Sequence, residues 1–299
     1  MSCSSATSPI NISKAGTGDC RLKCNYSFNY SPTSLQATNR GDFIRVSMDK
    51  SPQPPVVYNT ERYNVQEMRI YHPSLHTYGG KHAAGEILIM HNAVSGGSNM
   101  IVSIPIVDNG GSSSMMDELI TQVARSANTK GGKMNINLPV FSLEKIVPKA
   151  PYYNYSGTLP YDPCNGSYEY VVFDLSHPVS LTKASHSRLL KITKAASYGI
   201  KQPKDGLFYN SKGVSSLVSQ DEIYIECNPT GSDGSTMIKE KKAITSMSEA
   251  PAWLENLLGS GVLPIILAVI VFIIIMKVFH KAYEMFAEYL SKPAVASSN

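Results

Sequence analysis

The sequence predicts a mainly β domain of the α+β class, followed by one C-terminal transmembrane helix. Three observations support this prediction. Short runs rich in β-branched residues recur through the first 227 residues, only two stretches there have helical periodicity, and a long apolar segment lies near the C-terminus. The chain has 299 residues, 42% of them hydrophobic and 17% charged, so one domain with appendages is expected.

The predicted elements alternate between strands and only a few helices. Strands are predicted at residues 43–48, 85–91, 100–107, 168–175 and 222–227, and helices at residues 115–126 and 185–194. Such a pattern is typical of one sheet with short helices on its surface.

The C-terminal quarter predicts a membrane anchor. From Leu257 to Phe279 few residues interrupt the apolar run, which is long enough for the roughly 20 residues that a span needs. We therefore expect a polar stalk at residues 228–252, a transmembrane helix at 253–279 and a short amphipathic tail at 280–299. The alternative is a buried core helix, although core helices seldom stay apolar on all faces over this length.

The sequence leaves the orientation of the span open. The first residues have neither a basic start nor an apolar stretch, so no signal peptide is expected and the chain looks tail-anchored, with its large domain in the cytosol. Lys277 lies at the end of the span and Lys281 and Lys292 follow it, however, and the positive-inside rule would place the tail on the interior side. The two indications conflict.

Five segments, in order along the chain, resemble motifs of the α-carbonic anhydrases. They are residues 8–12 (Ser-Pro-Ile-Asn-Ile), 34–43, 84–92 (Ala-Gly-Glu-Ile-Leu-Ile-Met-His-Asn), 155–164 and 177–181. Together they cover roughly residues 8–227. The resemblance implies that residues 1–227 form a carbonic-anhydrase-like domain, with a central twisted sheet and short surface helices.

The resemblance also identifies the positions where the family binds zinc. Carbonic anhydrase is the standard example of a catalytic zinc held by three histidines, which lowers the pKa of the bound water. Here Arg69 and Tyr71 occupy the positions of the paired histidines and Leu88 that of the third. Asp42 replaces the proton-shuttle histidine and Pro160 the threonine that orients the zinc hydroxide. We therefore expect no enzyme activity, no metal and no other cofactor.

A displaced metal site is the alternative. Four of the seven histidines lie within twenty residues, at positions 72, 76, 82 and 91. Side chains alternate between the two faces of a strand, so His72 and His91 should point away from the face that carries Arg69 and Leu88. Ordinary core and surface histidines are the simpler interpretation.

The emptied zinc position predicts an ion pair. Glu86 matches a family carboxylate that orients a ligand histidine, so here it is expected to have lost its partner. Arg69 is the obvious replacement, and we predict that it pairs with Glu86 or Glu67. Alternatively, Arg69 extends to the mouth of the pocket and contacts solvent or an anionic ligand.

The five cysteines allow two interpretations. The resemblance implies a Cys20–Cys164 disulfide, as in the extracellular and membrane-bound members of the family. The absence of a signal peptide favours the alternative, in which all five cysteines are reduced thiols in a cytosolic protein.

An inactive domain, a basic stretch and a C-terminal span together resemble the catalytically inactive family members of poxvirus envelopes, which attach virions to sulfated glycosaminoglycans. The resemblance implies a single-pass protein of a virion envelope or internal virion membrane. The net charge is +4, and residues 183–204 contain no acidic residue. The candidates for polyanion contact in this stretch are Lys183, Arg188, Lys191, Lys194, Lys201 and Lys204.

Two other interpretations stay open. The basic stretch could be an ordinary solvated helix face. Alternatively, the chain could be a minor capsid or membrane scaffold protein of a large DNA virus, with a second copy or capsid and envelope proteins as partners. Neither interpretation involves nucleic acid, and we expect no nucleic acid partner.

Overall fold

The computed structural model describes residue 3, residues 5–20, 24–203 and 206–215, and residues 276, 277 and 281. The first compact unit of the chain spans Met1–Ile223. The predicted strand at 222–227 and the stalk lie outside the described residues. So do the predicted span and tail, apart from those three positions. Among the described residues, no helix combines the length and the apolar character that crossing a membrane requires.

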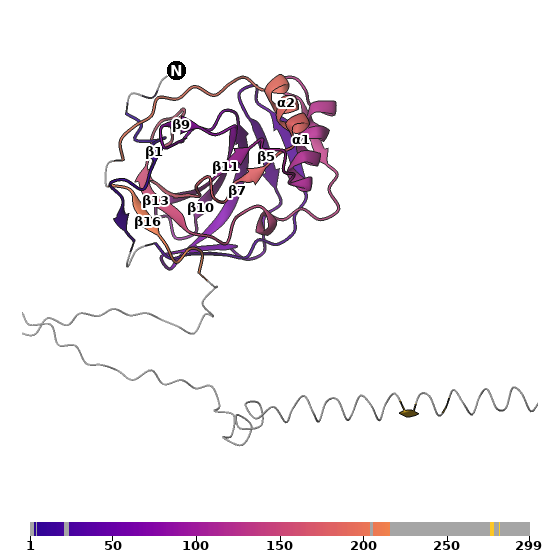
Figure 1. Ribbon diagram of the computed structural model, residues 1–299, viewed down its shortest axis with the longest axis horizontal. Helices are drawn as coiled ribbons and strands as arrows, with labels where there is room; N and C mark the ends of the chain where they lie inside the picture. The colour runs from indigo at the N-terminus through magenta and orange to yellow at the C-terminus, as the bar shows by residue number, and fades with distance from the viewer. Residues whose placement is uncertain are drawn as a thin grey trace, which may run out of the picture. The chain divides into compact units, whose positions relative to one another are not determined.

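The described elements are mostly short strands (Figure 1). The strands are β1 (Asn11–Ile12), β2 (Gly18–Asp19), β3 (Tyr26–Phe28), β4 (Leu35–Asn39), β5 (Ile44–Met48), β6 (Val56–Tyr58), β7 (Glu61–Tyr71), β8 (Thr77–Tyr78), β9 (Lys81–His82), β10 (Gly85–Ala93), β11 (Asn99–Val107), β12 (Lys133–Ile136), β13 (Tyr152–Gly157), β14 (Tyr168–Val172), β15 (Val179–Ser180) and β16 (Phe208–Asn210). The helices are α1 (Ser114–Ser126), α2 (Lys183–Ile192) and the 3₁₀ helix η1 (Leu143–Lys145).

One large mixed sheet dominates the domain. Within the described residues it has thirteen strands, and its main path runs β12-β4-β5-β7-β10-β11-β14-β13-β16-β2. A separate small sheet has the order β1-β8-β9. The sheet twists through the centre of the domain, and α1 and α2 lie side by side at one edge of the view (Figure 1). The prediction of a mainly β fold with few helices is confirmed.

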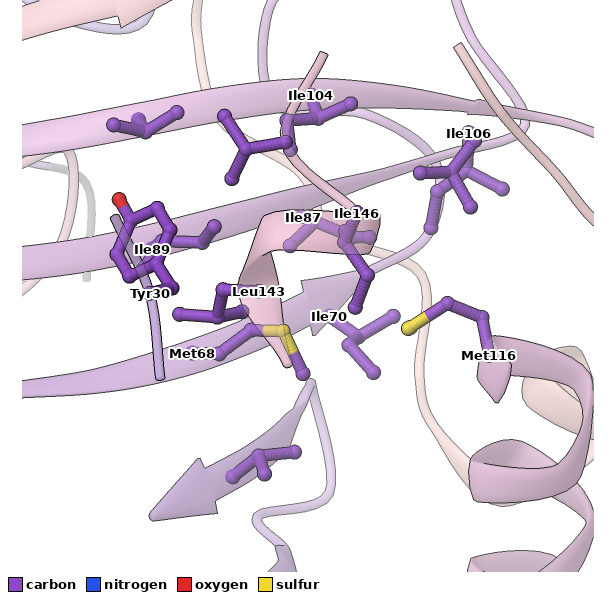
Figure 2. Packing of buried hydrophobic residues seen from close by; sticks show 14 of the residues in the cluster. Tyr30, Met68, Ile70, Ile87, Ile89, Ile104, Ile106, Met116, Leu143 and Ile146 are labelled. Carbon is purple, nitrogen blue, oxygen red and sulfur yellow. The ribbon is translucent and has the colours of Figure 1, made fainter. Parts of the chain in front are cut away.

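The two faces of the central strands have different environments. On β7, Met68 and Ile70 belong to the large apolar core, whereas Tyr71 belongs to a second cluster on the opposite face. Figure 2 shows the first face, where side chains of β7, β10 and β11 meet residues of α1 and η1. The residues that it labels are Tyr30, Met68, Ile70, Ile87, Ile89, Ile104, Ile106, Met116, Leu143 and Ile146. Each buried aliphatic side chain contributes about 1.5–3 kcal/mol to stability.

The two helices are positioned by apolar and polar contacts. Helix α1 buries a stripe of residues spaced three and four apart, namely Met116, Leu119, Ile120 and Val123. The buried Asn39 connects the C-terminal ends of both helices, because its side-chain amide donates to the Ala127 carbonyl at 3.2 Å and to the Ile192 carbonyl at 2.9 Å. The buried stripe of α1 and the Asn39 hydrogen bonds therefore fix the positions of the two helices relative to each other.

The predicted Cys20–Cys164 disulfide is wrong. The structure instead pairs Cys3 with Cys164, with Cα atoms 5.5 Å apart, and Cys20 with Cys24, with Cα atoms 5.9 Å apart. Both separations suit a disulfide. These four cysteines are therefore disulfide-bonded, contrary to the alternative of reduced thiols.

The courses of two segments explain the different pairing. Strand β2 pairs with β16 at the sheet edge, and the Cys20 amide donates to the Tyr209 carbonyl at 3.1 Å, which holds Cys20 near Cys24. The N-terminal segment instead runs beside the loop that carries Cys164. There the Thr7 and Thr158 amides each donate to the other residue's hydroxyl at 3.0 Å.

His91 on β10 makes the stability of this fold depend on pH. It is 0% exposed, and its Nε2 lies 2.9 Å from the Tyr30 hydroxyl. Burial lowers the pKa of His91 to about 3, compared with roughly 6.5 in an unfolded chain. As the pH falls from about 6.5 toward 3, the unfolded chain therefore binds a proton that the folded chain does not.

We predict that the free energy of unfolding falls by up to about 1.4 kcal/mol per pH unit through this window because of His91. Urea unfolding between pH 7 and pH 5 measures the slope. His91→Gln should flatten it, whereas His177→Gln, at a partly exposed histidine, should leave it unchanged. An identical slope in the wild type and His91→Gln would contradict this assignment.

Candidate functional site

The candidate site lies on the face of the sheet opposite the large core, where β7 and β10 run antiparallel. In their register, Arg69 is opposite Leu88 and Tyr71 is opposite Glu86. Residues directly opposite each other point to the same face, as do residues two apart on one strand. The structure therefore brings Arg69, Tyr71 and Leu88 together, as the sequence predicts.

Aromatic rings surround the guanidinium group of Arg69. Its Cζ lies 4.7 Å from the centre of the Phe43 ring and 4.4 Å from that of Tyr161. The Tyr71 ring packs at 5.0 Å from Phe43 and at 6.5 Å from Tyr161, and the Tyr71 hydroxyl accepts a hydrogen bond from Arg69 Nη1 at 3.4 Å. Cations attract aromatic faces, and the attraction is stronger where water is excluded.

Glu67 bridges two arginines beside this aromatic group. Arg69 Nε lies 2.5 Å from Oε1 of Glu67, and Arg45 Nε lies 2.5 Å from Oε2. The Glu67 side chain is 4% exposed and that of Arg69 is 18% exposed. Burial lowers the pKa of Arg69. Its neighbours Tyr161, Tyr71 and Glu67 raise that pKa by more, so it lies above the ordinary value and Arg69 stays a cation.

The prediction that Arg69 pairs with Glu67 or Glu86 is confirmed, and the partner is Glu67. Sequence reasoning missed Arg45. The strand register could have identified Arg45, because Arg45 on β5 lies directly opposite Arg69 on β7. Two like charges placed opposite each other are destabilising unless an anion lies between them, and Glu67 is that anion.

Glu86 has not lost its partner, contrary to expectation. It is 0% exposed, and its carboxylate lies 2.5 Å from His76 Nδ1 and accepts from the backbone amide of Leu75 at 2.5 Å and that of His76 at 3.1 Å. The Ser103 hydroxyl also donates to it. Burial raises the pKa of Glu86, but His76 and these hydrogen bonds outweigh burial, so the pKa lies below its usual value. The carboxylate is therefore ionised and fully hydrogen-bonded.

The Glu86 network continues to the N-terminal segment. His76 Nε2 lies 2.7 Å from the Tyr155 hydroxyl, and the Tyr155 ring stacks on Tyr170 at 4.5 Å. The Tyr170 hydroxyl donates to the Thr158 carbonyl at 2.8 Å and lies 3.1 Å from the Ser8 hydroxyl. The Ser-Pro-Ile-Asn-Ile motif is thus tied to the sheet through buried polar contacts.

The four neighbouring histidines have four separate partners. His72 Nε2 lies 3.0 Å from the Thr193 carbonyl, His76 contacts Glu86, His82 Nδ1 lies 2.6 Å from the Ser74 carbonyl, and His91 contacts Tyr30. Within the described parts of the chain, no three His, Cys, Asp or Glu side chains are grouped as a metal site requires. The histidines therefore act as separate structural residues.

The residues at the family's zinc position do not fit a zinc ion. Leu88 has no donor atom, and Arg69 is a cation held by Glu67. Burial raises the pKa of Tyr71 well above its usual value, so its phenol stays protonated. Zinc needs neutral imidazoles, thiolates or carboxylates in this place.

A pocket of about 690 Å³ adjoins the site through Tyr161. Its lining includes Asp42 and Pro160, the residues at the positions that the resemblance assigns to proton transfer and to hydroxide orientation. Tyr198 and Lys201 complete one wall, and the Tyr198 ring meets that of Tyr161 edge-on at 6.4 Å. The same lining also carries the polar side chains of Ser8, Asp162 and Ser197.

The six candidates for polyanion contact do not form one surface. Lys183, Arg188 and Lys191 are exposed on α2, and Lys194 is exposed just after it. Lys201 is partly buried and lines the pocket beside Tyr161, and Lys204 lies outside the described residues. Sequence reasoning missed Arg125 of α1, which lines a hollow together with Arg188 and Lys191.

We predict that Arg69→Ala lowers the free energy of unfolding by about 2–3 kcal/mol, because the change removes a partner of buried Glu67 and the cation between two rings. Chemical denaturation of the full-length chain measures the loss. Arg62→Ala, at an exposed arginine on the same strand, should change stability by about 0.5 kcal/mol or less. Equal effects of the two substitutions would contradict a structural role for Arg69.

Known proteins share this architecture. The model of the eukaryotic-type carbonic anhydrase family matches residues 2–210. The α-carbonic anhydrase of Photobacterium profundum is 17% identical with a TM-score of 0.59, and the match covers 70% of this chain and 90% of that one. The α-carbonic anhydrase of Thermovibrio ammonificans, solved with the inhibitor sulfanilamide, is 22% identical with a TM-score of 0.56, covering 70% and 88%. Dioscorin complexed with ascorbate is 17% identical with a TM-score of 0.59, covering 70% and 87%. The chain belongs to the eukaryotic-type carbonic anhydrase family.

Proposed function

We propose that this chain is a non-catalytic member of its family that attaches virions to sulfated glycosaminoglycans. Residues 253–279 would anchor it in a virion envelope or internal virion membrane. The observation that carries the binding proposal is the row of exposed cations on and just after α2, in a stretch from 183 to 204 without an acidic residue. The proposal treats the carbonic-anhydrase-like domain as a rigid support for this surface.

The loss of catalysis follows from the chemistry of the replaced ligands. A zinc ion at this place would have to displace the Arg69–Glu67 pair and the rings of Phe43 and Tyr161 from their mutual contacts. It would then find no imidazole among Arg69, Tyr71 and Leu88. Without the metal there is no polarised water to attack carbon dioxide.

We expect the purified full-length chain to bind far less than one zinc per chain and to hydrate carbon dioxide at the buffer rate. Elemental analysis and a stopped-flow pH-indicator assay measure the two quantities, with an active carbonic anhydrase as the positive control. One zinc per chain, or hydration well above the buffer rate, would overturn the non-catalytic part of the proposal.

The charge around α2 supports anion binding. Lys183, Arg188, Lys191 and Lys194 are exposed, and among the described residues none of them has a carboxylate partner. Arg188 and Lys191 lie three residues apart on the helix, so they share a face. Sulfates attracted by such charges bind more weakly as salt screens the field.

We predict that the full-length chain is retained on immobilised heparin and that Arg188→Glu, Lys191→Glu and Lys194→Glu together lower the salt concentration at which it elutes. A matched control carries three charge reversals at exposed cations outside this segment, Lys50, Arg62 and Lys81. The control should elute closer to the wild type, provided that both variants unfold at the wild-type temperature. Equal elution of the two triple variants would contradict binding through α2 and favour a scaffold role.

A further inference from the structure

A hollow of about 550 Å³ lies between α1 and α2. We call it the α1–α2 groove, and its lining residues are Thr121, Ala124, Arg125, Asn128, Thr129, Arg188, Lys191 and Ile192. Three of these residues are cations and none is acidic. Three others, Thr121, Asn128 and Thr129, carry neutral hydrogen-bonding side chains. This composition suits a ligand that has both negative charge and hydroxyl groups.

Hydrogen bonds hold the two walls of the groove together at both ends. At one end, Asn39 donates to the last carbonyls of α1 and α2. At the other end, the Asp117 carboxylate of α1 accepts from the amide of Thr182 at 3.1 Å and from its hydroxyl at 2.9 Å, just before α2 begins. A groove that is already ordered loses little conformational entropy when a ligand binds.

The groove carries more cations than are needed to balance the negative ends of the two helix dipoles. Each helix C-terminus carries roughly half a unit of negative charge, or about one unit for the two helices that end here. Arg125 and Lys191 in the last turns would balance that charge. Arg188 is a further cation in the lining of the groove. Lys130 and Lys194 are exposed cations one and two residues beyond the lining residues Thr129 and Ile192.

Lys130 and Lys194 both contact the turn that carries Gly41. The Lys194 amide donates to the Gly41 carbonyl at 2.7 Å. The Lys130 side chain packs so closely on Gly41 that a β-carbon there would lie 3.1 Å from its Cδ. In the described part of the chain, no carboxylate pairs with Arg125, Lys130, Arg188, Lys191 or Lys194. The positive charge at this surface is therefore uncompensated.

We propose that the α1–α2 groove is a defined binding site for a sulfated sugar unit of a glycosaminoglycan, with Arg125 as a specificity-determining residue. This inference rests on the proposed function and adds a site to it. The guanidinium groups of Arg125 and Arg188 would each offer paired N–H donors to sulfate oxygens. Thr121, Asn128 and Thr129 would contact the sugar hydroxyls.

The composition of the groove favours a glycan over other polyanions. Binding of single-stranded nucleic acid without base pairing relies on aromatic side chains that stack on bases, and no aromatic residue lines the groove. Its volume falls in the range that accommodates a small ligand, such as one or two sugar units. A longer chain would continue over Lys130 and Lys194.

The test measures binding of a heparin-derived tetrasaccharide to the full-length chain in detergent. Arg125→Ala should weaken binding about tenfold, as expected for losing charged hydrogen bonds. Arg125→Lys, which keeps the charge but not the paired donors, should weaken it less than Arg125→Ala. Arg62→Ala, which removes the same charge from an exposed arginine outside the groove, should leave binding within about twofold of the wild type.

The outcomes separate this inference from the proposed function. If the wild type binds the tetrasaccharide and Arg125→Ala binds it equally well, the groove is not the site, although glycosaminoglycan binding stands. If the wild type does not bind the tetrasaccharide at all, the proposed function itself fails. Tighter binding of a single-stranded oligonucleotide or of anionic lipid vesicles, with the same dependence on Arg125, would overturn the choice of a sulfated glycan.

Discussion

The need to satisfy two buried carboxylates on one face of β7 and β10 governs the centre of this domain. Glu67 and Glu86 are almost fully excluded from water, where an unpaired charge would be very costly. Glu67 is neutralised by Arg45 and Arg69, whereas Glu86 contacts His76 and accepts three further hydrogen bonds. The Glu67 contacts join β5 to β7, and the Glu86 contacts join β10 to β11 and to the segment that carries Leu75 and His76, so both carboxylates help to fix the fold around them.

Arg69 and its partners Phe43, Tyr161 and Glu67 lie where the resemblance places the family's metal site, and they hold positive charge in a different way. A zinc site concentrates positive charge on one ion and holds it with neutral imidazoles. Here the positive charge is a planar guanidinium between Phe43 and Tyr161, balanced by a carboxylate on the same strand. Packing and ion pairing thereby stabilise this part of the fold.

The surface proposed for binding lies on different elements from the pocket that Tyr161 lines. The pocket is lined by loops that carry Asp42, Tyr161 and Tyr198, whereas the α1–α2 groove belongs to the helices. Lys201 lines the pocket and Arg188 the groove, although both belong to the same acid-free stretch of sequence. The fold thus divides one basic segment between two sites, and only the groove combines several cations with neutral hydrogen-bonding residues.

Local pattern determined much of what the sequence predicts here. Strand periodicity and the family motifs predict the central strands, the two helices and the face shared by Glu67, Arg69, Tyr71, Glu86 and Leu88, because neighbours along a strand fix which face each side chain takes. Three other features depend on the tertiary structure: the His76–Glu86 contact, the pairing of Cys3 with Cys164 and the position of Arg125 beside Arg188. Each joins segments that are separated in sequence, and no periodicity carries that information. Whether a buried charge is paired, and with which partner, is decided only when the folded chain removes water from around it.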